Sequence, residues 1–235
     1  MSKQDVHTSI IKIEVLLLTI SPNSSPPIRA CIFDMDGLLI NSEDILTRCI
    51  NTLLAKYDRP AITRHLRVQL MGVPDSTSSD LFHNWAQVPI TRANFDRELK
   101  DEMKRQFTAC EPMPGAKDLL TNLSRAQCSG TGQPIELALA STTTTSTYRL
   151  KTSRPETKAL LHTFAGNKRI LGDDSRIPPG RGKPAPDIYQ IALRVLNSIS
   201  GSESPRPPIQ PNECLVFQDS IAGVEAGRRA GMRTV

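Results

Sequence analysis

The sequence predicts an α/β fold built on a parallel sheet, with a helical segment inserted after the first strand. Short apolar runs alternate with stretches of helical periodicity, which is the pattern of layered α/β proteins. The interval from 42 to 114 shows helical spacing and no strand-like run. At 235 residues, the chain is long enough for one sizeable core and a smaller insert.

Four apolar runs are expected to form buried parallel strands, because strands covered on both faces are apolar throughout. Helical stretches follow the strands, so the sheet is Rossmann-like. Gly231 stops the last helix, and the run from Met232 to Val235 begins a fifth strand that appears truncated. The expected strands are Arg29–Phe33, Glu136–Ala140, Lys168–Leu171 and Cys214–Phe217, and the expected core helices are Ala116–Arg125, Thr144–Lys151, Pro186–Asn197 and Ala222–Ala230.

The chain is expected to divide into an extension, a core and a cap. Residues 1–28 form an N-terminal extension that is expected to be flexible, because a Ser/Pro-rich linker ends it. Residues 29–42 and 112–235 form the core, and residues 43–111 form the helical cap. The expected cap helices are Ile45–Tyr57, Asp75–Trp85 and Arg92–Phe107.

Composition narrows the range of partners and compartments. The net charge is +5, without a block of like charges, so a nucleic-acid partner is not expected. The most basic stretch, Arg149 to Lys158, is interrupted and is expected to be a solvated face. The uncharged run Val15–Ile20 is too short to cross a membrane. Five cysteines without a C-x-x-C pair favour a reducing, cytoplasmic location and no zinc site. A monomer is expected.

The run Cys31-Ile-Phe-Asp-Met-Asp-Gly37 carries the strongest chemical signal. It places Asp34 and Asp36 at the carboxyl edge of the sheet, where α/β proteins bind ligands. In a regular strand the two carboxylates would face the same way and repel each other. A divalent cation relieves such repulsion, and oxygen ligands suit Mg²⁺. Asp34 is therefore the candidate nucleophile and Asp36 the candidate acid and base.

Further polar residues lie at the ends of the later strands. Ser141 and Thr142 follow the second strand and open a helix, where hydroxyl and N–H groups bind phosphate. Lys183 lies in a loop stiffened by two prolines and is a candidate phosphate ligand. Asp219 ends the fourth strand and is a second candidate metal carboxylate. Together these residues supply what phosphoryl transfer to an aspartate needs.

This set resembles the haloacid dehalogenase-like hydrolase superfamily. The matching motifs are D-x-D-G at Asp34 to Gly37, Ser141, G-K-P at Gly182 to Pro184, and Asp219. Among its members, the chain looks closest to helical-cap phosphatases that act on pseudouridine 5'-phosphate, 2-deoxyglucose 6-phosphate or glycerol 3-phosphate.

The resemblance implies a Mg²⁺-dependent phosphomonoesterase acting on a small sugar, polyol or nucleotide phosphate. Asp34 would form an aspartyl-phosphate, and Asp36 would protonate the leaving oxygen and then activate water. The backbone carbonyl of Asp36 would join Asp34 and Asp219 around the metal. The cap would close over the substrate.

One departure from the family pattern is Gln218, where relatives often carry a glutamate. Its amide oxygen can still act as a metal ligand, but the charge loss predicts weaker Mg²⁺ binding than in Gln218→Glu, which a Mg²⁺ titration measures. Two alternative functions stay open. One is a phosphosugar mutase built from the same parts. The other is a degenerate or truncated relative that binds phosphorylated metabolites without turnover.

Overall fold

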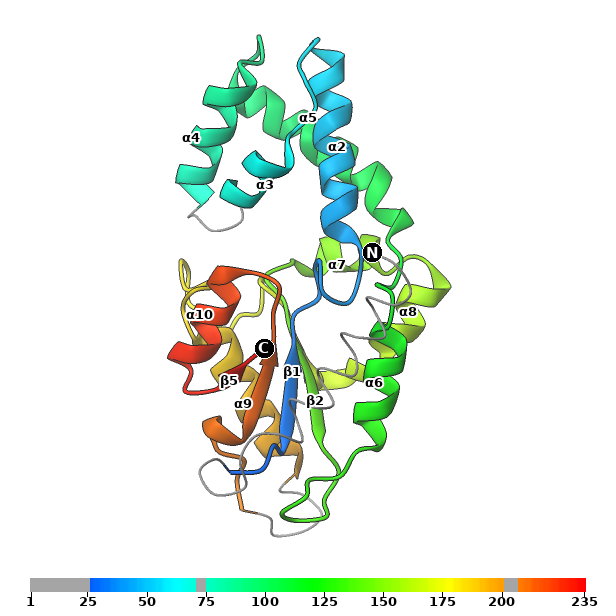
Figure 1. The fold of residues 1–235 in the computed structure, drawn as a ribbon, viewed down its shortest axis with the longest axis vertical. Helices are drawn as coiled ribbons and strands as arrows, with labels where there is room; N and C mark the ends of the chain where they lie inside the picture. The colour runs from blue at the N-terminus through cyan, green and yellow to red at the C-terminus, as the bar shows by residue number, and fades with distance from the viewer. Residues whose placement is uncertain (1–25, 71–74, 201–206) are drawn as a thin grey trace.

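The computed structural model describes residues 26–70, 75–200 and 207–235, so most of the expected N-terminal extension lies outside the described residues. The described chain forms a core with a sheet, and a separate group of helices above it (Figure 1). This arrangement confirms the predicted fold class. In that part of the chain, no helix is long and apolar enough to cross a membrane.

The sheet has five parallel strands in the order β3-β2-β1-β4-β5. The first strand therefore lies at the centre, with Ala30 opposite both Glu136 and Cys214. The expected fifth strand is present, and it pairs with β4 at one edge of the sheet. The strands are β1 (Ala30–Phe33), β2 (Glu136–Ala140), β3 (Arg169–Ile170), β4 (Cys214–Phe217) and β5 (Arg233–Thr234).

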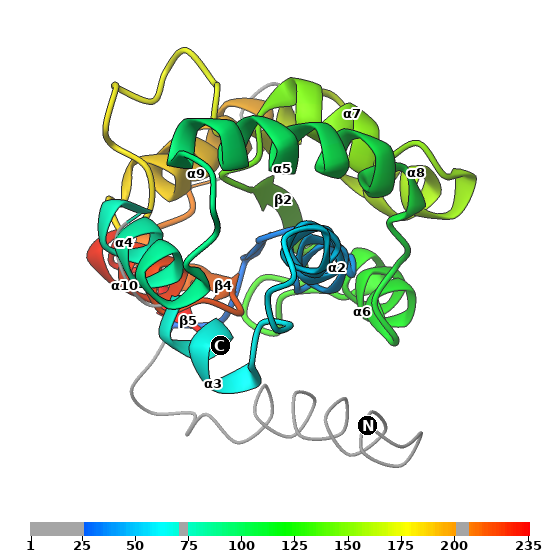
Figure 2. The same cartoon turned by 90° about the horizontal axis from the view of Figure 1, so that it is seen from above.

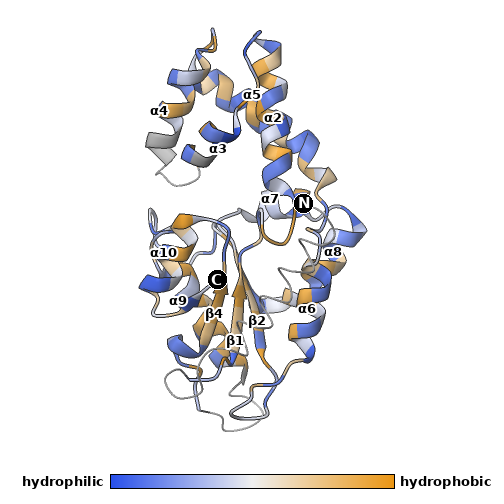
Figure 3. Cartoon of the chain, viewed as in Figure 1, coloured by the Kyte–Doolittle hydropathy of each residue, from blue (hydrophilic) through white to orange (hydrophobic). Residues whose placement is uncertain are grey.

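Helices cover both faces of the sheet. Side chains alternate along β1, so Cys31 and Phe33 face one apolar cluster while Ala30 and Ile32 face the other. The central strand β1 and its neighbour β4 are accordingly apolar along their whole length (Figure 3). The first cluster includes residues of α6 (Ala116–Arg125), α7 (Thr145–Lys151) and α8 (Pro155–Leu161), and the second includes residues of α9 (Asp187–Ser200) and α10 (Ile221–Arg229). Short 3-10 helices lie at Phe107–Ala109, His162–Phe164, Gly166–Lys168 and Pro211–Glu213.

Four helices form the cap over the carboxyl edge of the sheet (Figures 1 and 2). They are α2 (Ser42–Lys56), α3 (Arg64–Leu70), α4 (Asp75–Ala86) and α5 (Arg92–Gln106). A separate apolar cluster, which includes Leu54, Phe82 and Phe95, holds the cap together. The expected cap helices are present, and α3 and α8 are two helices that the sequence did not predict.

Two crossing segments connect the cap to the core. Ile40 bridges Pro112 in antiparallel fashion. Asn41 donates its backbone N–H to the carbonyl of Glu111 at 3.0 Å, and the N–H of Glu111 donates to Asn41 Oδ1 at 2.8 Å. These reciprocal bonds fix the point at which the chain leaves and re-enters the core.

Candidate active site

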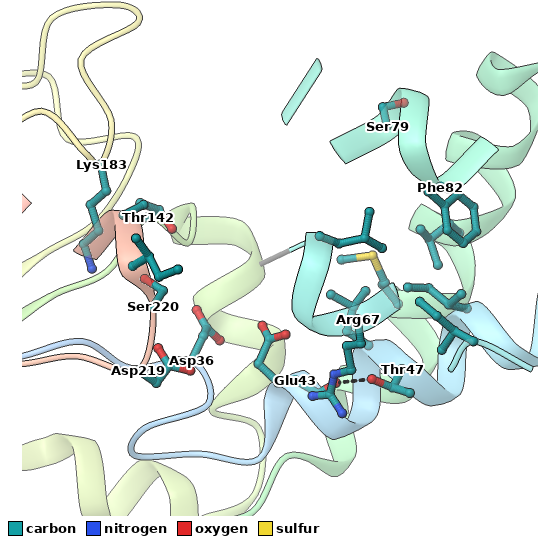
Figure 4. A pocket seen from close by; sticks show the side chains of 18 of the residues that line it. Asp36, Glu43, Thr47, Arg67, Ser79, Phe82, Thr142, Lys183, Asp219 and Ser220 are labelled. Atoms are coloured by element: carbon teal, nitrogen blue, oxygen red, sulfur yellow. Dashed lines mark hydrogen bonds between the residues drawn. The ribbon is translucent and has the colours of Figure 1, made fainter. Parts of the chain in front are cut away.

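Asp34 lies on the floor of a cavity between the core and the cap. Strand β1 ends at Phe33, and the N–H of Asp34 donates to the carbonyl of Phe217 at 3.1 Å, which extends the pairing with β4 by one residue. The side chain of Asp34 is buried. The cavity has a volume of about 1230 Å³, and both core and cap residues line it. Figure 4 shows Lys183, Asp36 and Asp219 on its core side and Arg67 and Phe82 on its cap side.

Lys183 supplies the positive charge beside Asp34. Its Nζ lies 3.1 Å from Asp34 Oδ1 and donates to the carbonyl of Ala140 at 3.0 Å. Nζ also lies 5.2 Å from the centre of the Tyr189 ring. Burial alone would lower the pKa of Lys183, but the charge of Asp34 and contact with Tyr189 outweigh it and raise that pKa. Lys183 is therefore a buried ammonium held at the nucleophile candidate.

Asp36 accepts four side-chain hydrogen bonds. Ser42 Oγ and Lys151 Nζ each donate to Oδ1 at 2.6 Å. Thr143 Oγ1 donates to Oδ2 at 2.8 Å, and Ser141 Oγ donates to the same atom at 3.3 Å. Burial favours a raised pKa, but the charge of Lys151 and the hydrogen bonds lower the pKa of Asp36 overall. In this arrangement both carboxyl oxygens of Asp36 accept hydrogen bonds.

The expectation that Asp34 and Asp36 lie in one regular strand, in which they would face the same way, is not met. It assumed a regular strand through Asp36, whereas β1 ends at Phe33 and Gly37 has a φ of +72°. Asp34 pairs with Lys183, which precedes α9, and Asp36 pairs with Lys151 on α7. These two helices pack on opposite faces of the sheet, so each carboxylate has its own cation.

Ser141 and Thr142 lie before α7 but do not open it. Thr144 caps the helix through the N–H of Thr147, and Asp173 accepts the N–H of Thr145 at 2.9 Å. The helix-start N–H of Thr145 is therefore already bonded, contrary to expectation. Thr142 is exposed and lines the cavity, as Asp34 does, whereas the hydroxyl of Ser141 is bonded to Asp36.

Asp219 lies against the turn at Gly37, on the core side of the cavity. A Cβ atom at position 37 would come within 2.1 Å of Asp219 Oδ2, so only glycine fits beside this carboxylate. Burial of the carboxyl group, together with the charges of Asp34 and Glu43, raises the pKa of Asp219 to about 6. Part of Asp219 still reaches solvent, so water screens this effect.

Gln218 is buried behind Asp219, and both ends of its amide are engaged. Its Nε2 donates to the hydroxyl of Tyr189 at 2.9 Å, and its Oε1 accepts from Ser220 Oγ at 2.9 Å. A Cβ atom at Gly223 would lie 1.9 Å from Gln218 Oε1, so α10 starts in close contact with the amide. Its role as a metal ligand stays a prediction.

The oxygen atoms at this site suit a hard cation. Asp34 Oδ1 is buried and accepts no hydrogen bond of good geometry, although Lys183 lies within ion-pair distance. The negative charges of Asp34 and Glu43 act on the carboxylate of Asp219. Among the described residues, no three His, Cys, Asp or Glu side chains are grouped to hold a metal by themselves. A cation bound by Asp34 and Asp219 therefore needs a further, backbone ligand, which the carbonyl of Asp36 is expected to provide.

The sequence analysis missed several polar residues of the site. The main correction is Lys151, which was expected on a solvated face but is buried against Asp36. Glu43 lines the cavity, and burial together with the charge of Asp36 raises its pKa. The available signal for Glu43 was its place nine residues after Asp34, in the first turn of the first cap helix. The other missed residues are Ser42, Thr143 and Tyr189.

Comparisons with known proteins agree with this geometry. The family model for "haloacid dehalogenase-like hydrolase" matches residues 28–231. The chain is 37% identical over 210 residues to the uncharacterized protein C4C5.01 of Schizosaccharomyces pombe, covering 88% of this chain and 78% of that protein. It is 35% identical to a probable pseudouridine-5'-phosphatase of Saccharomyces cerevisiae, covering 88% of this chain and 81% of that protein.

Solved structures show the same fold. The chain superposes on a putative beta-phosphoglucomutase from Thermotoga maritima with a TM-score of 0.60 and 27% identity, covering 88% of this chain and 84% of that one. The family match spans four of the five strands of the described sheet, the cap and every candidate site residue from Asp34 to Asp219. This chain therefore belongs to the haloacid dehalogenase-like hydrolases.

Proposed function

We propose that the protein is a Mg²⁺-dependent phosphomonoesterase that acts on a small phosphorylated metabolite through an aspartyl-phosphate on Asp34. The observation that carries this proposal is the environment of Asp34. Its Oδ1 atom is buried, accepts no hydrogen bond of good geometry from the described residues, and lies 3.1 Å from the Lys183 ammonium at the floor of a cavity. Because Asp34 lines the cavity, its carboxylate group is placed to meet a bound phosphate, and the adjacent cation attracts a phosphate dianion.

Each residue has a role in this reaction. A carboxylate oxygen of Asp34 attacks phosphorus, and the bond from phosphorus to the leaving oxygen breaks. Asp36, which enters this step in its protonated form, gives its proton to that oxygen and becomes a carboxylate. Asp36 then takes a proton from water, whose oxygen attacks phosphorus and releases inorganic phosphate from Asp34. Lys183 and the hydroxyl of Thr142 are the phosphate ligands, and Ser141 orients Asp36 through its hydroxyl.

Mg²⁺ would be held by Asp34, Asp219 and the carbonyl of Asp36. It would neutralise charge between the carboxylates and the phosphate. Gln218 would hold Ser220, the residue after Asp219, by accepting a hydrogen bond from its hydroxyl group.

The relatives favour a phosphorylated carbohydrate or nucleoside as substrate. The yeast relative is named a probable pseudouridine-5'-phosphatase, and an Arabidopsis relative that is 29% identical is named a glycerol-3-phosphatase. The cap side of the cavity offers both apolar side chains such as Phe82 and Leu99 and polar ones such as Arg67 and Thr47. We also propose that the protein is a monomer and is located in the cytoplasm.

The test is phosphate release from a panel of small phosphomonoesters, with Mg²⁺ or with a chelator. We expect release by the wild type with Mg²⁺, and a loss of at least about 100-fold in Asp34→Asn, because the amide is not a nucleophile. Asp174→Asn is the matched control, since Asp174 pairs with Arg176 outside the cavity. Release that persists in Asp34→Asn contradicts the proposal. Activity only with a sugar bisphosphate activator would indicate the mutase instead.

A further inference from the structure

The buried lysine on α7 is not explained by the proposed roles of the other residues. Lys151 is 7% exposed, and its side chain reaches from the last turn of α7 to the edge of the sheet. Burying an ammonium costs several kcal/mol unless it is paired, and an apolar residue of similar size would pack there without that cost. Stability alone therefore does not account for a lysine at this position.

Three contacts fix the ammonium in place. Lys151 Nζ donates to Asp36 Oδ1 at 2.6 Å and to Thr143 Oγ1 at 3.0 Å. It also lies 4.6 Å from the centre of the Phe107 ring, at a distance typical of a cation–π contact. Phe107 directly follows α5 and belongs to the first apolar cluster, so its ring holds one side of the lysine while Asp36 and Thr143 hold the other.

The three polar side chains form a closed network. Thr143 accepts from Lys151 and donates to Asp36 Oδ2 at 2.8 Å, so Lys151 contacts one carboxylate oxygen directly and the other through Thr143. A carboxylate bonded through both oxygens cannot rotate without losing a bond. Neither Lys151 nor Thr143 lines the cavity, so the network reaches the cavity only through Asp36.

We propose that Lys151 is a positioning residue for the reaction, which acts by holding the carboxylate of Asp36 in the orientation from which it serves as acid and base. Thr143 is the second part of the same device. The inference rests on the role proposed for Asp36. It assigns Lys151 no contact with the substrate and no part in the bond changes at phosphorus.

This role has a kinetic signature that a structural role lacks. An alkyl alcohol leaves only when an acid protonates it, and a positioned acid contributes about 10²–10⁴-fold. p-Nitrophenolate leaves without a proton. The quantity kcat/KM covers the steps up to release of the alcohol. Displacing Asp36 should therefore lower kcat/KM for an alkyl phosphate and hardly change it for p-nitrophenyl phosphate.

The experiment compares kcat/KM for these two esters in the full chain with Mg²⁺, the alkyl ester being the one that the wild type cleaves best. For Lys151→Met we expect a loss of at least about tenfold with the alkyl ester and less than about threefold with p-nitrophenyl phosphate. Thr143→Val should show the same selectivity with a smaller loss, and it serves as the test if Lys151→Met fails to fold. Asp36→Asn is the positive control.

The matched control is Lys158→Met, because Lys158 is an exposed lysine on the neighbouring helix α8. It should leave both values unchanged. An equal loss with both esters, no loss, or a gain with the alkyl ester overturns the inference and leaves the proposed function standing. If the wild type cleaves neither ester in an Asp34-dependent way, the proposed function itself fails, and the inference falls with it.

Discussion

At the scale of single residues, the two candidate aspartates differ in the cation that pairs with each and in the hydrogen bonds that each accepts. Asp34 and Asp36 are separated by one residue, yet each has a different buried lysine beside it. The two carboxylates also differ in hydrogen bonding. Asp34 has one oxygen without a hydrogen bond from the described residues, whereas Asp36 accepts four. In the proposed reaction, Asp34 is the nucleophile, and Asp36, with four hydrogen bonds, carries the proton.

Asp219 gives a pH dependence that can be measured without substrate. Its pKa is raised to about 6 in the folded protein, from 3.8 for an ordinary aspartate. Between these values the folded state binds more protons than the unfolded state, so this group lowers the stability of the metal-free protein as the pH rises through that window. Asp219→Asn removes the charge.

We therefore expect Asp219→Asn to raise the Tm in chelator at pH 7.5 relative to the wild type, but not at pH 4. Adding Mg²⁺ should reverse the difference at pH 7.5, because only the carboxylate binds the cation well. Differential scanning fluorimetry measures both effects. A Tm difference in chelator that is the same at the two pH values would contradict the raised pKa.

At the scale of elements, β1 leads directly into the proposed nucleophile Asp34 and contributes to one apolar cluster. Phe33 directly precedes Asp34 and is fully buried. Its ring stacks on Phe217 with centroids 4.5 Å apart and an interplanar angle of 12°, and it lies 5.8 Å from Phe164. The stack joins the ends of β1 and β4, the two strands that place Asp34 and Asp219.

Truncating this ring should cost much of the stability of the core. For Phe33→Ala we expect a loss of about 3–5 kcal/mol in the free energy of unfolding, because a large buried cavity is left. Urea denaturation followed by circular dichroism measures it. Ile221→Ala is the control, since Ile221 is 68% exposed and should change stability by less than about 0.5 kcal/mol. A similar small change in Phe33→Ala would show that the stack is not needed.

Some elements follow from the sequence and others do not. The strands and long helices are set by local apolar patterns, so their positions are predictable to within a few residues. Helices α3 and α8 have seven residues each, which is too short for a periodic pattern to stand out. Residues at strand ends could be predicted to meet because parallel strands end at one edge. Lys151 could not, because its partner Asp36 lies 115 residues away and only the packing of α7 turns it inward.

On the scale of the whole molecule, the cavity is shared between two bodies joined by the crossing segments at Asn41 and Glu111. Its core side provides Asp34, Lys183 and Asp219, and its cap side provides Arg67 and Phe82. A volume of about 1230 Å³ leaves ample room for water beside a small ester. Efficient proton transfer to the leaving alcohol, and phosphoryl transfer to one ordered water, need a smaller cavity from which other water is excluded.

We expect the cap to move toward the core when a phosphate analogue binds. Mg²⁺ with orthovanadate should lower the radius of gyration measured by small-angle X-ray scattering toward the ~17 Å typical of a compact chain of this length. The same additions should leave Asp34→Asn unchanged. An unaltered radius in the wild type, with vanadate shown to inhibit, would mean that the arrangement in Figure 1 is already the working one.

The central place of β1 has a consequence for how the chain is made. The ribosome releases β1 before either of its neighbours exists, and Ala30 must wait for both Glu136 and Cys214 to be synthesised. At ~5–20 residues per second, the second neighbour arrives about 10–40 s after the first strand. All the described cap helices lie between residues 42 and 106, so they are synthesised in that interval. Until β2 is made, the nascent chain therefore carries an apolar strand without a partner, and we expect chaperones to bind it at this stage.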